Sequence, residues 1–373
     1  RTSNSKGLVN KEKIINFTFN GDSYQGYEGD TLASALIANG IHLVGRSFKY
    51  HRPRGFLGAG VEEPNAMVQL HEGDRSEPNI MATEVELVEG LKAKSQNCWP
   101  SVKFDIGEIN NILNRFFPAG FYYKTFMWPK SFWFKVYEPF IRKAAGMGVA
   151  PLSPDPDRYE HNYEHCDVLV VGSGPSGLSS ALAAAKNGAR VILAEDKAHF
   201  GGSLLNDDVT IGNMSGREWA SDVISQLKNM PNVVVKNRSQ VFGYYDHNMT
   251  VMFERVSDHL ENSSKYTPRQ RLHYIRAGEV IVSTGSIERP ISFGNNDRPG
   301  IFLASAAREY MKVYETLVGK KPIIFTNNDS AYATALEFIK NDIKPIIVDT
   351  RDNSDGQLVK EVQEQGINIR FNS

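Results

Sequence analysis

Cysteine is scarce in this chain of 373 residues, which contains only Cys98 and Cys166. The two cysteines lie far apart and match no metal-ligand or redox spacing, so a disulfide framework and thiol–disulfide chemistry are excluded. A protein without structural disulfides favours a reducing compartment, and we expect a cytoplasmic location. The nine histidines form no Ser-His-Asp or metal-ligand pattern, so we predict no catalytic residue and no metal site in this chain.

An excess of charge of one sign is also missing, because 42 lysines and arginines oppose 43 aspartates and glutamates, for a net charge of -1. This balance gives no electrostatic reason to expect a nucleic acid or an anionic membrane as a partner. Long apolar runs are missing as well. The nearest candidate for a membrane span, residues 116–140, contains lysines and prolines that a bilayer core would penalise.

The first segment, residues 13–95, has the order of elements of a ferredoxin-like β-grasp domain. An Asn20-Gly21 hairpin turn joins the first two strands. A helix follows, which is capped by Thr31 or Asp30 at its start and by Gly40 at its end. After a long loop come two further strands. The strands are expected at residues 14–19, 23–27, 67–70 and 81–87. The loop 48–60 stands where a plant-type ferredoxin places its cluster cysteines and contains none, so we expect the fold without an iron–sulfur centre.

The second segment, residues 96–160, is a connector of helix and loop that is rich in aromatic residues and ends in a proline-rich linker. So many rings must be buried, and burial between domains is favoured over a role in ligand binding. Burial against another subunit is the third possibility. The rings are Phe116, Phe117, Phe121, Tyr122, Tyr123, Phe126, Trp128, Phe132, Trp133, Phe134, Tyr137 and Phe140.

A glycine-rich turn between a strand and a helix opens the third segment. The strand at residues 167–171 leads directly into Gly172-Ser173-Gly174-Pro175-Ser176-Gly177, and an Ala-rich helix continues to residue 186. The first glycine permits the bend, the second lets the backbone approach a pyrophosphate, and the third lets helix and strand pack closely. The helix N-terminus adds amide donors for the phosphates. A glycine-rich turn without a ligand is the alternative.

An acidic residue follows at the spacing that such a site needs. The next strand ends in Glu195, eighteen residues after Gly177. Its carboxylate can accept two hydrogen bonds from ribose hydroxyls and would repel a 2′-phosphate. Lys197 is expected in solvent or near the adenosine rather than as a phosphate ligand.

Further along, Gly201-Gly202-Ser203 follows Glu195, and a strand at residues 277–283 ends in Thr284-Gly285. This combination resembles the flavoprotein disulfide-reductase superfamily, in which the Thr-Gly turn touches the cofactor. The resemblance implies an α/β fold with a Rossmann-type FAD/NAD(P)-binding domain, which we expect at residues 161–320. A second Rossmann unit at residues 321–373 has Asn327-Asn328 in place of its glycines, so a structural relic is favoured over a working site.

A dense basic run, residues 46–55, contains Arg46, Lys49, Arg52 and Arg54 with aromatic rings between them. Two interpretations stay open. The run is either a solvated loop or an anion site, for a flavin phosphate or an acidic partner surface.

Taken together, the chain is similar to the α subunit of heterotetrameric sarcosine oxidase. The most specific stretches are the glycine turn with Gly201-Gly202 and residues 45–60, 117–139, 241–248 and 299–308. The resemblance implies that the α subunit binds NAD where related reductases hold FAD. The implied contacts are Ser176, Glu195, Asp196, Lys197, Ser203 and Val241, added to the glycine turn of Gly172, Gly174, Pro175 and Gly177, and to Gly202, Thr284 and Gly285.

The same resemblance implies the rest of the complex. The β subunit would hold FMN and FAD and oxidise sarcosine or a similar N-methyl amino acid, with oxygen giving hydrogen peroxide, and FMN would lie at the α–β interface. The γ and δ subunits would complete the complex. In the family, the α subunit continues into a C-terminal aminomethyltransferase-like domain that binds tetrahydrofolate, and we expect no counterpart of that domain in this sequence. Alternatives are an FAD-bearing α subunit of an opine or cyanide-forming dehydrogenase, and a non-catalytic assembly scaffold.

Overall fold

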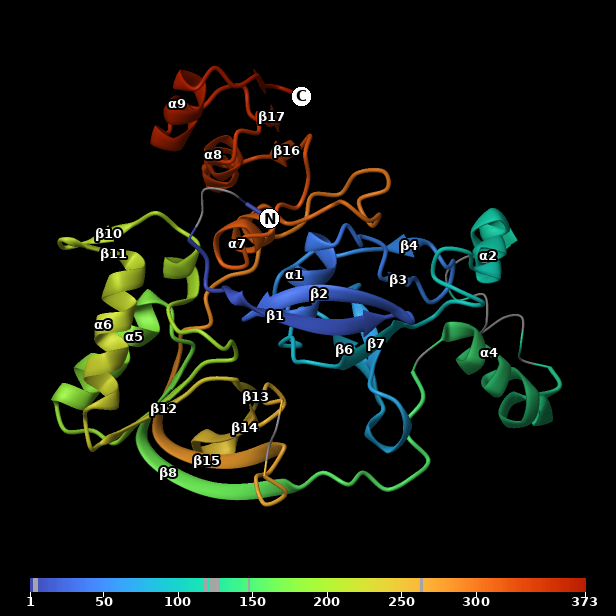
Figure 1. Cartoon of the computed structure of the whole chain (residues 1–373), viewed down its shortest axis with the longest axis horizontal. Coiled ribbons are helices and arrows are strands. Elements are labelled where there is room, and N and C mark those ends of the chain that lie inside the picture. The colour runs from blue at the N-terminus through green and yellow to red at the C-terminus, as the bar shows by residue number, and fades with distance from the viewer. Residues whose placement is uncertain (3–5, 117–119, 121–125, 127, 147, 262–263) are drawn as a thin grey trace.

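The computed structural model describes residues 1–2, 6–116, 120, 126, 128–146, 148–261 and 264–373. The chain begins with a ferredoxin-like β-grasp domain, as expected, whose five-stranded sheet has the order β2-β1-β7-β5-β6 (Figure 1). Its elements are β1 (Asn10–Phe19), β2 (Asp22–Glu28), α1 (Leu32–Ala38), β3 (Gly45–Arg46), β4 (Pro53–Arg54), β5 (Met67–Leu70), η1 (Gly73–Arg75), β6 (Glu77–Met81) and β7 (Leu91–Ser95).

Local sequence explains most of this domain. Thr31 caps α1 in a capping box with Ser34, and Gly40 after the helix has a φ of 76°. The predicted strand at residues 81–87 is wrong, because the strand ends at Met81 and a turn follows. The missing strand is β7, which pairs in parallel with β1 in the middle of the sheet. Its five residues are too short for a clear strand pattern, and long-range pairing decides their conformation.

The dinucleotide-binding domain is built on a six-stranded sheet of order β12-β9-β8-β15-β14-β13, in which the first four strands are parallel. Helices α5 and α6 pack against one face through a core that includes Leu178, Val223 and Leu227 (Figure 1). This confirms the predicted Rossmann-type fold. The elements are β8 (Tyr159–Val171), α5 (Pro175–Lys186), β9 (Val191–Ala194), η6 (Gly202–Leu205), β10 (Thr210–Ile211), β11 (Met214–Ser215), α6 (Gly216–Lys228), β12 (Val233–Lys236), β13 (Ser239–Tyr245), η7 (Asp246–Asn248), β14 (Met249–Arg255) and β15 (Gln270–Val282).

The last part of the chain forms a parallel sheet, β16-β17-β18, with helices packed on it. One hydrophobic core joins this part to the first domain, because Phe17 and Leu36 belong to the same buried cluster as Tyr310 and Phe338. The dinucleotide-binding domain is therefore inserted into a unit that both ends of the chain build. The elements are α7 (Ala304–Lys312), β16 (Ile323–Thr326), η8 (Asp329–Ala331), α8 (Tyr332–Lys340), β17 (Ile346–Asp349), α9 (Gln357–Glu364) and β18 (Ile369–Arg370).

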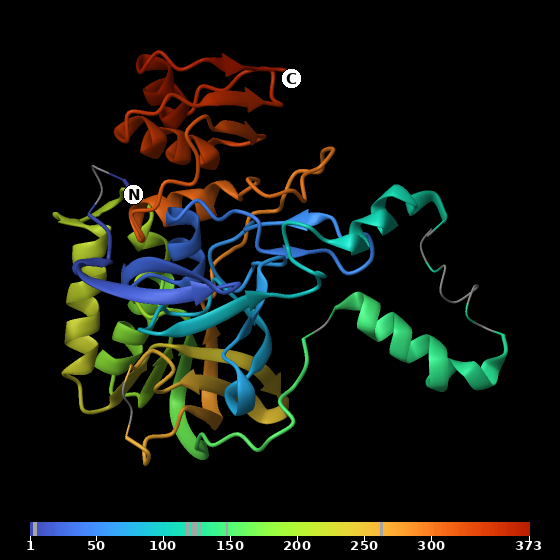
Figure 2. The ribbon, with the colours of Figure 1, turned by 45° about the vertical axis from the view of Figure 1, so that its right-hand side comes forward.

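The aromatic-rich connector projects from the body of the molecule (Figure 2). We call its described residues between 99 and 146 the aromatic arm. Phe116, Trp128, Phe134 and Phe140 are exposed, so the expected burial between domains is wrong. Of the rings in that prediction, Phe117, Phe121, Tyr122 and Tyr123 lie outside the described residues. The elements of the arm are η2 (Ile106–Glu108), α2 (Ile109–Ile112), η3 (Asn114–Phe116), η4 (Lys130–Phe132), η5 (Trp133–Tyr137) and α4 (Glu138–Ala145).

No helix that the structure describes combines the length and the apolar character needed to cross a bilayer.

Candidate functional site

The glycine turn between β8 and α5 requires glycine at its first and third positions. Gly172 has a φ of 95°, and a Cβ there would lie 2.4 Å from the carbonyl oxygen of Ser283. A Cβ at Gly177 would lie 1.9 Å from the carbonyl oxygen of Gly172. These two glycines serve the packing of the turn itself, as the fingerprint predicts.

Gly174 differs from the other two glycines, because a Cβ on it would meet no atom within 4 Å. It is the N-cap of α5, has no side chain to cap the helix, and precedes Pro175 in the first helical turn. Pro175 and Ser176 are exposed. Pro175 has no N–H, so the first free amide of the 12-residue helix is that of Ser176, which is exposed and lacks a capping side chain. A phosphate can accept a hydrogen bond from it.

Glu195, at the end of β9, is buried and points into this turn. One carboxylate oxygen accepts a hydrogen bond from the Ser173 amide at 2.9 Å, and the other accepts one from the Lys197 amide at 3.1 Å. Burial, together with the neighbouring Asp196 carboxylate, raises the pKa of Glu195 to about 7. With the Ser173 hydroxyl as a third donor, about one of its four lone-pair positions is left for a ribose hydroxyl, instead of the two expected.

Ser173 is a site residue that the sequence did not reveal. Its fully buried hydroxyl donates to Glu195 at 2.5 Å and accepts a hydrogen bond from the Gly201 amide at 3.2 Å. One side chain thus connects the glycine turn, the acidic end of β9 and the double-glycine turn. The signal available in the sequence was a small hydroxyl residue between two glycines, with an acid closing the next strand.

The expected position of Lys197 in solvent is wrong, whereas its position near the adenosine stays a prediction. Its ammonium group pairs with Glu309 of α7 at 2.5 Å, and the Asn206 amide donates to the same carboxylate at 3.2 Å. Burial opposes the charge of Lys197, but the Glu309 carboxylate outweighs burial and raises the pKa of Lys197 above its usual value. Glu309 lies 112 residues further along the chain, so local sequence could not predict this pair.

The remaining predicted residues surround the same turn. A Cβ at Gly202 would lie 2.9 Å from the Cα of Gly174, and Ser203 follows in η6. Thr284 and Gly285 are exposed directly after β15, and the Thr284 Cα lies 3.4 Å from the Cβ position of Gly172. Val241 of β13 lies further away, against the cluster that includes Ile192 and Ala194.

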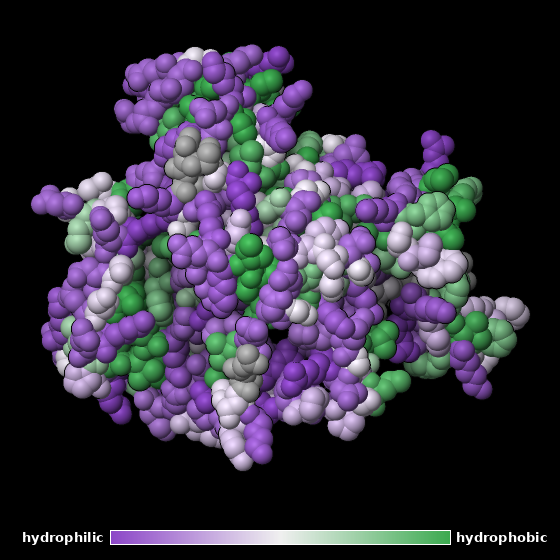
Figure 3. Space-filling view, in the orientation of Figure 1, coloured by the Kyte–Doolittle hydropathy of each residue, from purple (hydrophilic) through white to green (hydrophobic). Residues whose placement is uncertain are grey.

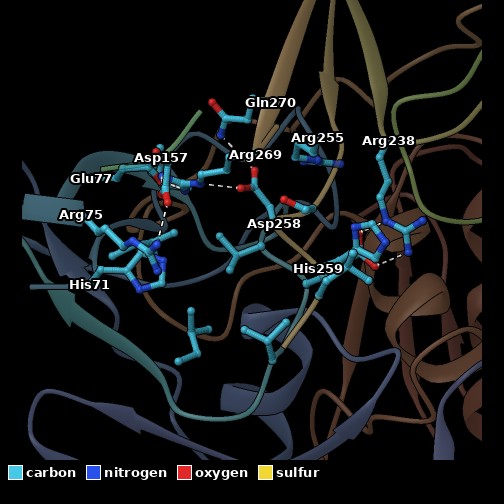
Figure 4. A pocket seen from close by; sticks show the side chains of 18 of the residues that line it. His71, Arg75, Glu77, Asp157, Arg238, Arg255, Asp258, His259, Arg269 and Gln270 are labelled. Carbon is cyan, nitrogen blue, oxygen red and sulfur yellow. Dashed lines mark hydrogen bonds and ion pairs between the residues drawn. The ribbon is translucent and has the colours of Figure 1, made fainter. Parts of the chain in front are cut away.

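A cavity of about 730 Å³ lies between the ferredoxin-like domain and the β13–β15 region. Figure 4 shows side chains that line it. Arginines of the dinucleotide-binding domain pair here with glutamates of the ferredoxin-like domain: Arg238 with Glu86, Arg255 with Glu84, and Arg269 with Glu77. Arg255 also donates to the backbone carbonyl of Asp196 at 2.7 Å. The contacts around this cavity therefore fix the Glu195–Lys197 loop against the first domain.

Arginines of the basic run have partners within the chain. Asp297 accepts hydrogen bonds from Arg52, at 2.7 Å, and from Arg54. The same two arginines hold the pKa of the Asp297 carboxyl well below its usual range. Arg46 is buried and donates to the Val102 carbonyl at 2.9 Å. A simple solvated loop is therefore wrong, because each of these arginines has an anionic or carbonyl partner within the chain. Binding of a flavin phosphate or of an acidic partner by the donors that are left stays a prediction.

The loop that would hold an iron–sulfur cluster is organised by a carboxylate. Glu63 is 3% exposed and accepts hydrogen bonds from the amides of Leu57, Gly58, Asn65 and Ala66. These four amides surround a side chain of this protein, and the loop offers no thiolate, so its residues do not fit an iron–sulfur cluster. Among the described residues, no group of three His, Cys, Asp or Glu could hold a metal ion.

The second Rossmann unit has a capped helix start in place of a glycine turn. The Asn328 side chain accepts hydrogen bonds from the amide of Ser330 at 2.9 Å and from its hydroxyl at 2.6 Å. That amide is one that a phosphate would need. We continue to predict that this turn binds no dinucleotide.

Two families match parts of the chain: a 2Fe-2S iron-sulfur cluster binding domain at residues 12–98 and an FAD dependent oxidoreductase at residues 167–240. The chain is 51% identical to the sarcosine oxidase subunit alpha of Rhizobium meliloti (strain 1021), over 93% of this chain and 35% of that protein. It is 33% identical to the corresponding subunit of Corynebacterium sp. (strain U-96), over 92% of this chain and 31% of that protein. The chain thus spans about a third of the length of these relatives.

Among solved structures, L-proline dehydrogenase from P. horikoshii superimposes with a TM-score of 0.61 at 19% identity, over 95% of this chain and 57% of that chain. This likeness shows a shared fold.

Proposed function

We propose that this chain, a homologue of sarcosine oxidase α subunits along 93% of its length, holds NAD at the glycine turn as part of an amine-oxidising complex. The observation that carries the proposal is the contrast between Gly174 and its neighbours. Gly172 and Gly177 are glycines because protein atoms crowd them, whereas Gly174 faces open space. A glycine in open space beside a helix N-terminus suits a close backbone approach by a pyrophosphate.

The residues of the site fit the parts of NAD. Gly174, Pro175, Ser176 and the start of α5 would hold the pyrophosphate, while Glu195 and Asp196 would face the ribose. Gly202, Ser203, Thr284 and Gly285 would border the dinucleotide, with Val241 towards the adenine. We expect NAD rather than NADP, because Glu195 repels a 2′-phosphate and Lys197, the nearest cation in the sequence, is paired with Glu309.

The oxidation itself is assigned to another subunit. The described part of this chain has no nucleophile–base pair at the glycine turn, and its buried acid, Glu195, is engaged by backbone and side-chain donors. We propose that a cytoplasmic β subunit, with FMN and FAD, oxidises sarcosine or a similar N-methyl amino acid and passes electrons to oxygen, giving hydrogen peroxide. FMN would lie between α and β, and tetrahydrofolate would bind beyond the region described in this chain, with γ and δ subunits completing the assembly.

FAD at the same turn is the second candidate. It is favoured by the match of residues 167–240 to a family of FAD dependent oxidoreductases. Glycine turn, helix N-terminus and acidic ribose partner suit the ADP part of either molecule equally well.

Extraction of the bound cofactor distinguishes these candidates. The protein is purified, denatured and separated by chromatography, and the released compound is identified by absorption and mass. NAD absorbs only in the ultraviolet, whereas FAD has a visible flavin band. Recovery of NAD supports the proposal and recovery of FAD supports the second candidate. If the washed protein yields neither and binds neither on titration, the chain is an assembly scaffold and the proposal is wrong.

A further inference from the structure

The base of the aromatic arm is anchored by buried polar contacts from the basic run. Two guanidinium nitrogens of Arg46 donate to the Val102 carbonyl at 2.9 and 2.8 Å, and a third pairs with Glu108 at 3.1 Å. The His51 ring bonds to the buried Asp105 carboxylate at 2.6 Å. Because these contacts hold both ends of η2, helix α2 is presented in a fixed orientation.

The side chains that the two described halves of the arm present are apolar. Ile112 of α2 is 78% exposed and Phe134 of η5 is 82% exposed, and other large apolar side chains of the arm are exposed too. Hydrophobic side chains gather on the right-hand side of the molecule in Figure 3. The other exposed residues of the arm include Phe104, Ile106, Ile109, Phe116, Trp128, Phe132 and Phe140. Exposed apolar residues in one region, rather than scattered singly, mark an interaction surface.

The rim of this surface is positively charged, although the whole chain has a net charge of -1. Within the described part of the arm, the salt bridges of Arg46 with Glu108 and of Arg142 with Glu138 occupy the two half-buried glutamates. No described ion pair involves Arg115, Lys130, Lys135 or Lys143, which are all exposed. The complementary surface is therefore apolar in its centre and acidic at its edge.

We propose that the aromatic arm docks onto a partner subunit, in an apolar groove with an acidic rim. The choice of the β subunit as that partner rests on the proposed function. A protein groove is chosen over a lipid surface because the relatives that match this chain are alpha subunits of an oxidase, and a subunit has partner chains to contact. Preorganised presentation of the arm also lowers the entropy that a specific interface must overcome.

Binding of the purified chain to the β subunit of the same organism tests the proposal. We expect the double substitution Ile112→Ser and Phe134→Ser to weaken the complex at least tenfold. The matched control is Ile323→Ser, which changes a residue 67% exposed on β16 and should bind as the wild type does. Lys130→Glu with Lys135→Glu should slow association and reduce its salt dependence, whereas Lys94→Glu on β7 should not.

Three results would overturn the docking proposal. They are unchanged β-subunit binding by the arm variants, equal weakening by Ile323→Ser, and failure of the NAD-loaded wild-type chain to bind the β subunit at all. Flotation with phosphatidylserine vesicles that the arm variants lose, while they keep β-subunit binding, would also overturn it in favour of a membrane. If the chain binds the β subunit through the arm but retains no dinucleotide, docking is supported and the proposed function fails.

Discussion

Replacing Ser173 with alanine tests whether this buried hydroxyl organises the dinucleotide site. The substitution removes two hydrogen bonds, one to the Glu195 carboxylate and one from the Gly201 amide. Hydrogen bonds to charged groups contribute about 1.5–3 kcal/mol, which corresponds to about a tenfold to hundredfold change in an equilibrium constant. We expect NAD affinity to fall within that range, because the three loops are no longer held together for the ligand.

The pH dependence of NAD binding gives a more specific result. The ordinary pKa of a glutamate, 4.5, is raised to about 7 at Glu195, so this group favours the folded state below pH 4.5 and loses that contribution as the pH rises towards 7. The affinity for NAD depends on pH in the opposite direction from the folding stability, because the ionised carboxylate of Glu195 is the better acceptor for a ribose hydroxyl. NAD affinity of the wild type should therefore rise between about pH 6 and pH 8. Loss of the Ser173 donor should raise the pKa of Glu195 further and move this rise to higher pH.

Isothermal titration with NAD at several pH values, together with thermal unfolding, measures both effects. Ser225→Ala is the matched control, because Ser225 is exposed on α6 and its hydroxyl donates to the Ser221 carbonyl, one helical turn earlier, at 2.8 Å. Ser173→Thr keeps the hydroxyl and should restore the pH profile. If Ser173→Ala binds NAD like the wild type with the same pH profile, or if only the melting temperature changes, the positioning role of Ser173 is wrong.

Three further predictions concern the same domain. Gly174→Val should abolish NAD retention without lowering the melting temperature, because a Cβ at this position meets no protein atom. Gly177→Ala should unfold the domain, because its Cβ would collide with the backbone of Gly172. Equal stability of the two variants would contradict this. The stripped protein should bind NAD more tightly than NADP in fluorescence titrations, and the opposite order would make Lys197 a phosphate ligand. The buried His273 ring lies between two carboxylates, with its Nδ1 2.5 Å from Glu164 and its Nε2 2.6 Å from Glu254, and Lys236 is nearby. Burial opposes a positive charge on the ring, but both carboxylates favour that charge and raise the pKa of His273 above its ordinary 6.5. Its stabilising contribution is complete below that value and is lost as the pH rises through the raised pKa, so His273→Gln should cost about 3 kcal/mol of unfolding free energy at pH 6 and less at pH 9. Denaturant unfolding at the two pH values measures this, and an equal loss at both would refute the ion-pair assignment.

Local sequence was sufficient for the parts of the molecule in which one segment determines its own conformation. The glycine turn, α5 and β9 follow from residues that are close in sequence, and so does the capping of α1 by Thr31. Several failures involve partners that are distant in the chain. Lys197 forms an ion pair with Glu309, Arg52 forms one with Asp297, and β7 pairs with β1. No local sequence pattern predicts such pairs.

The exposure of the aromatic arm was a different kind of failure. Counting rings correctly indicated a need for burial, but composition cannot tell whether the covering surface belongs to the same chain. The glycine turn by itself predicts a dinucleotide but not whether it is NAD or FAD, because the groups that contact the ADP part are common to both.

The core shared by Phe17, Leu36, Tyr310 and Phe338 also determines the order in which a newly synthesised chain can fold. The first sheet leaves the ribosome long before α7 and α8 exist, so part of its apolar surface stays without a partner during most of translation. The dinucleotide-binding domain, whose strands all lie between residues 159 and 282, can close on its own in the meantime. Of these two units, the one that starts first along this sequence is therefore completed second, after the domain inserted between its halves.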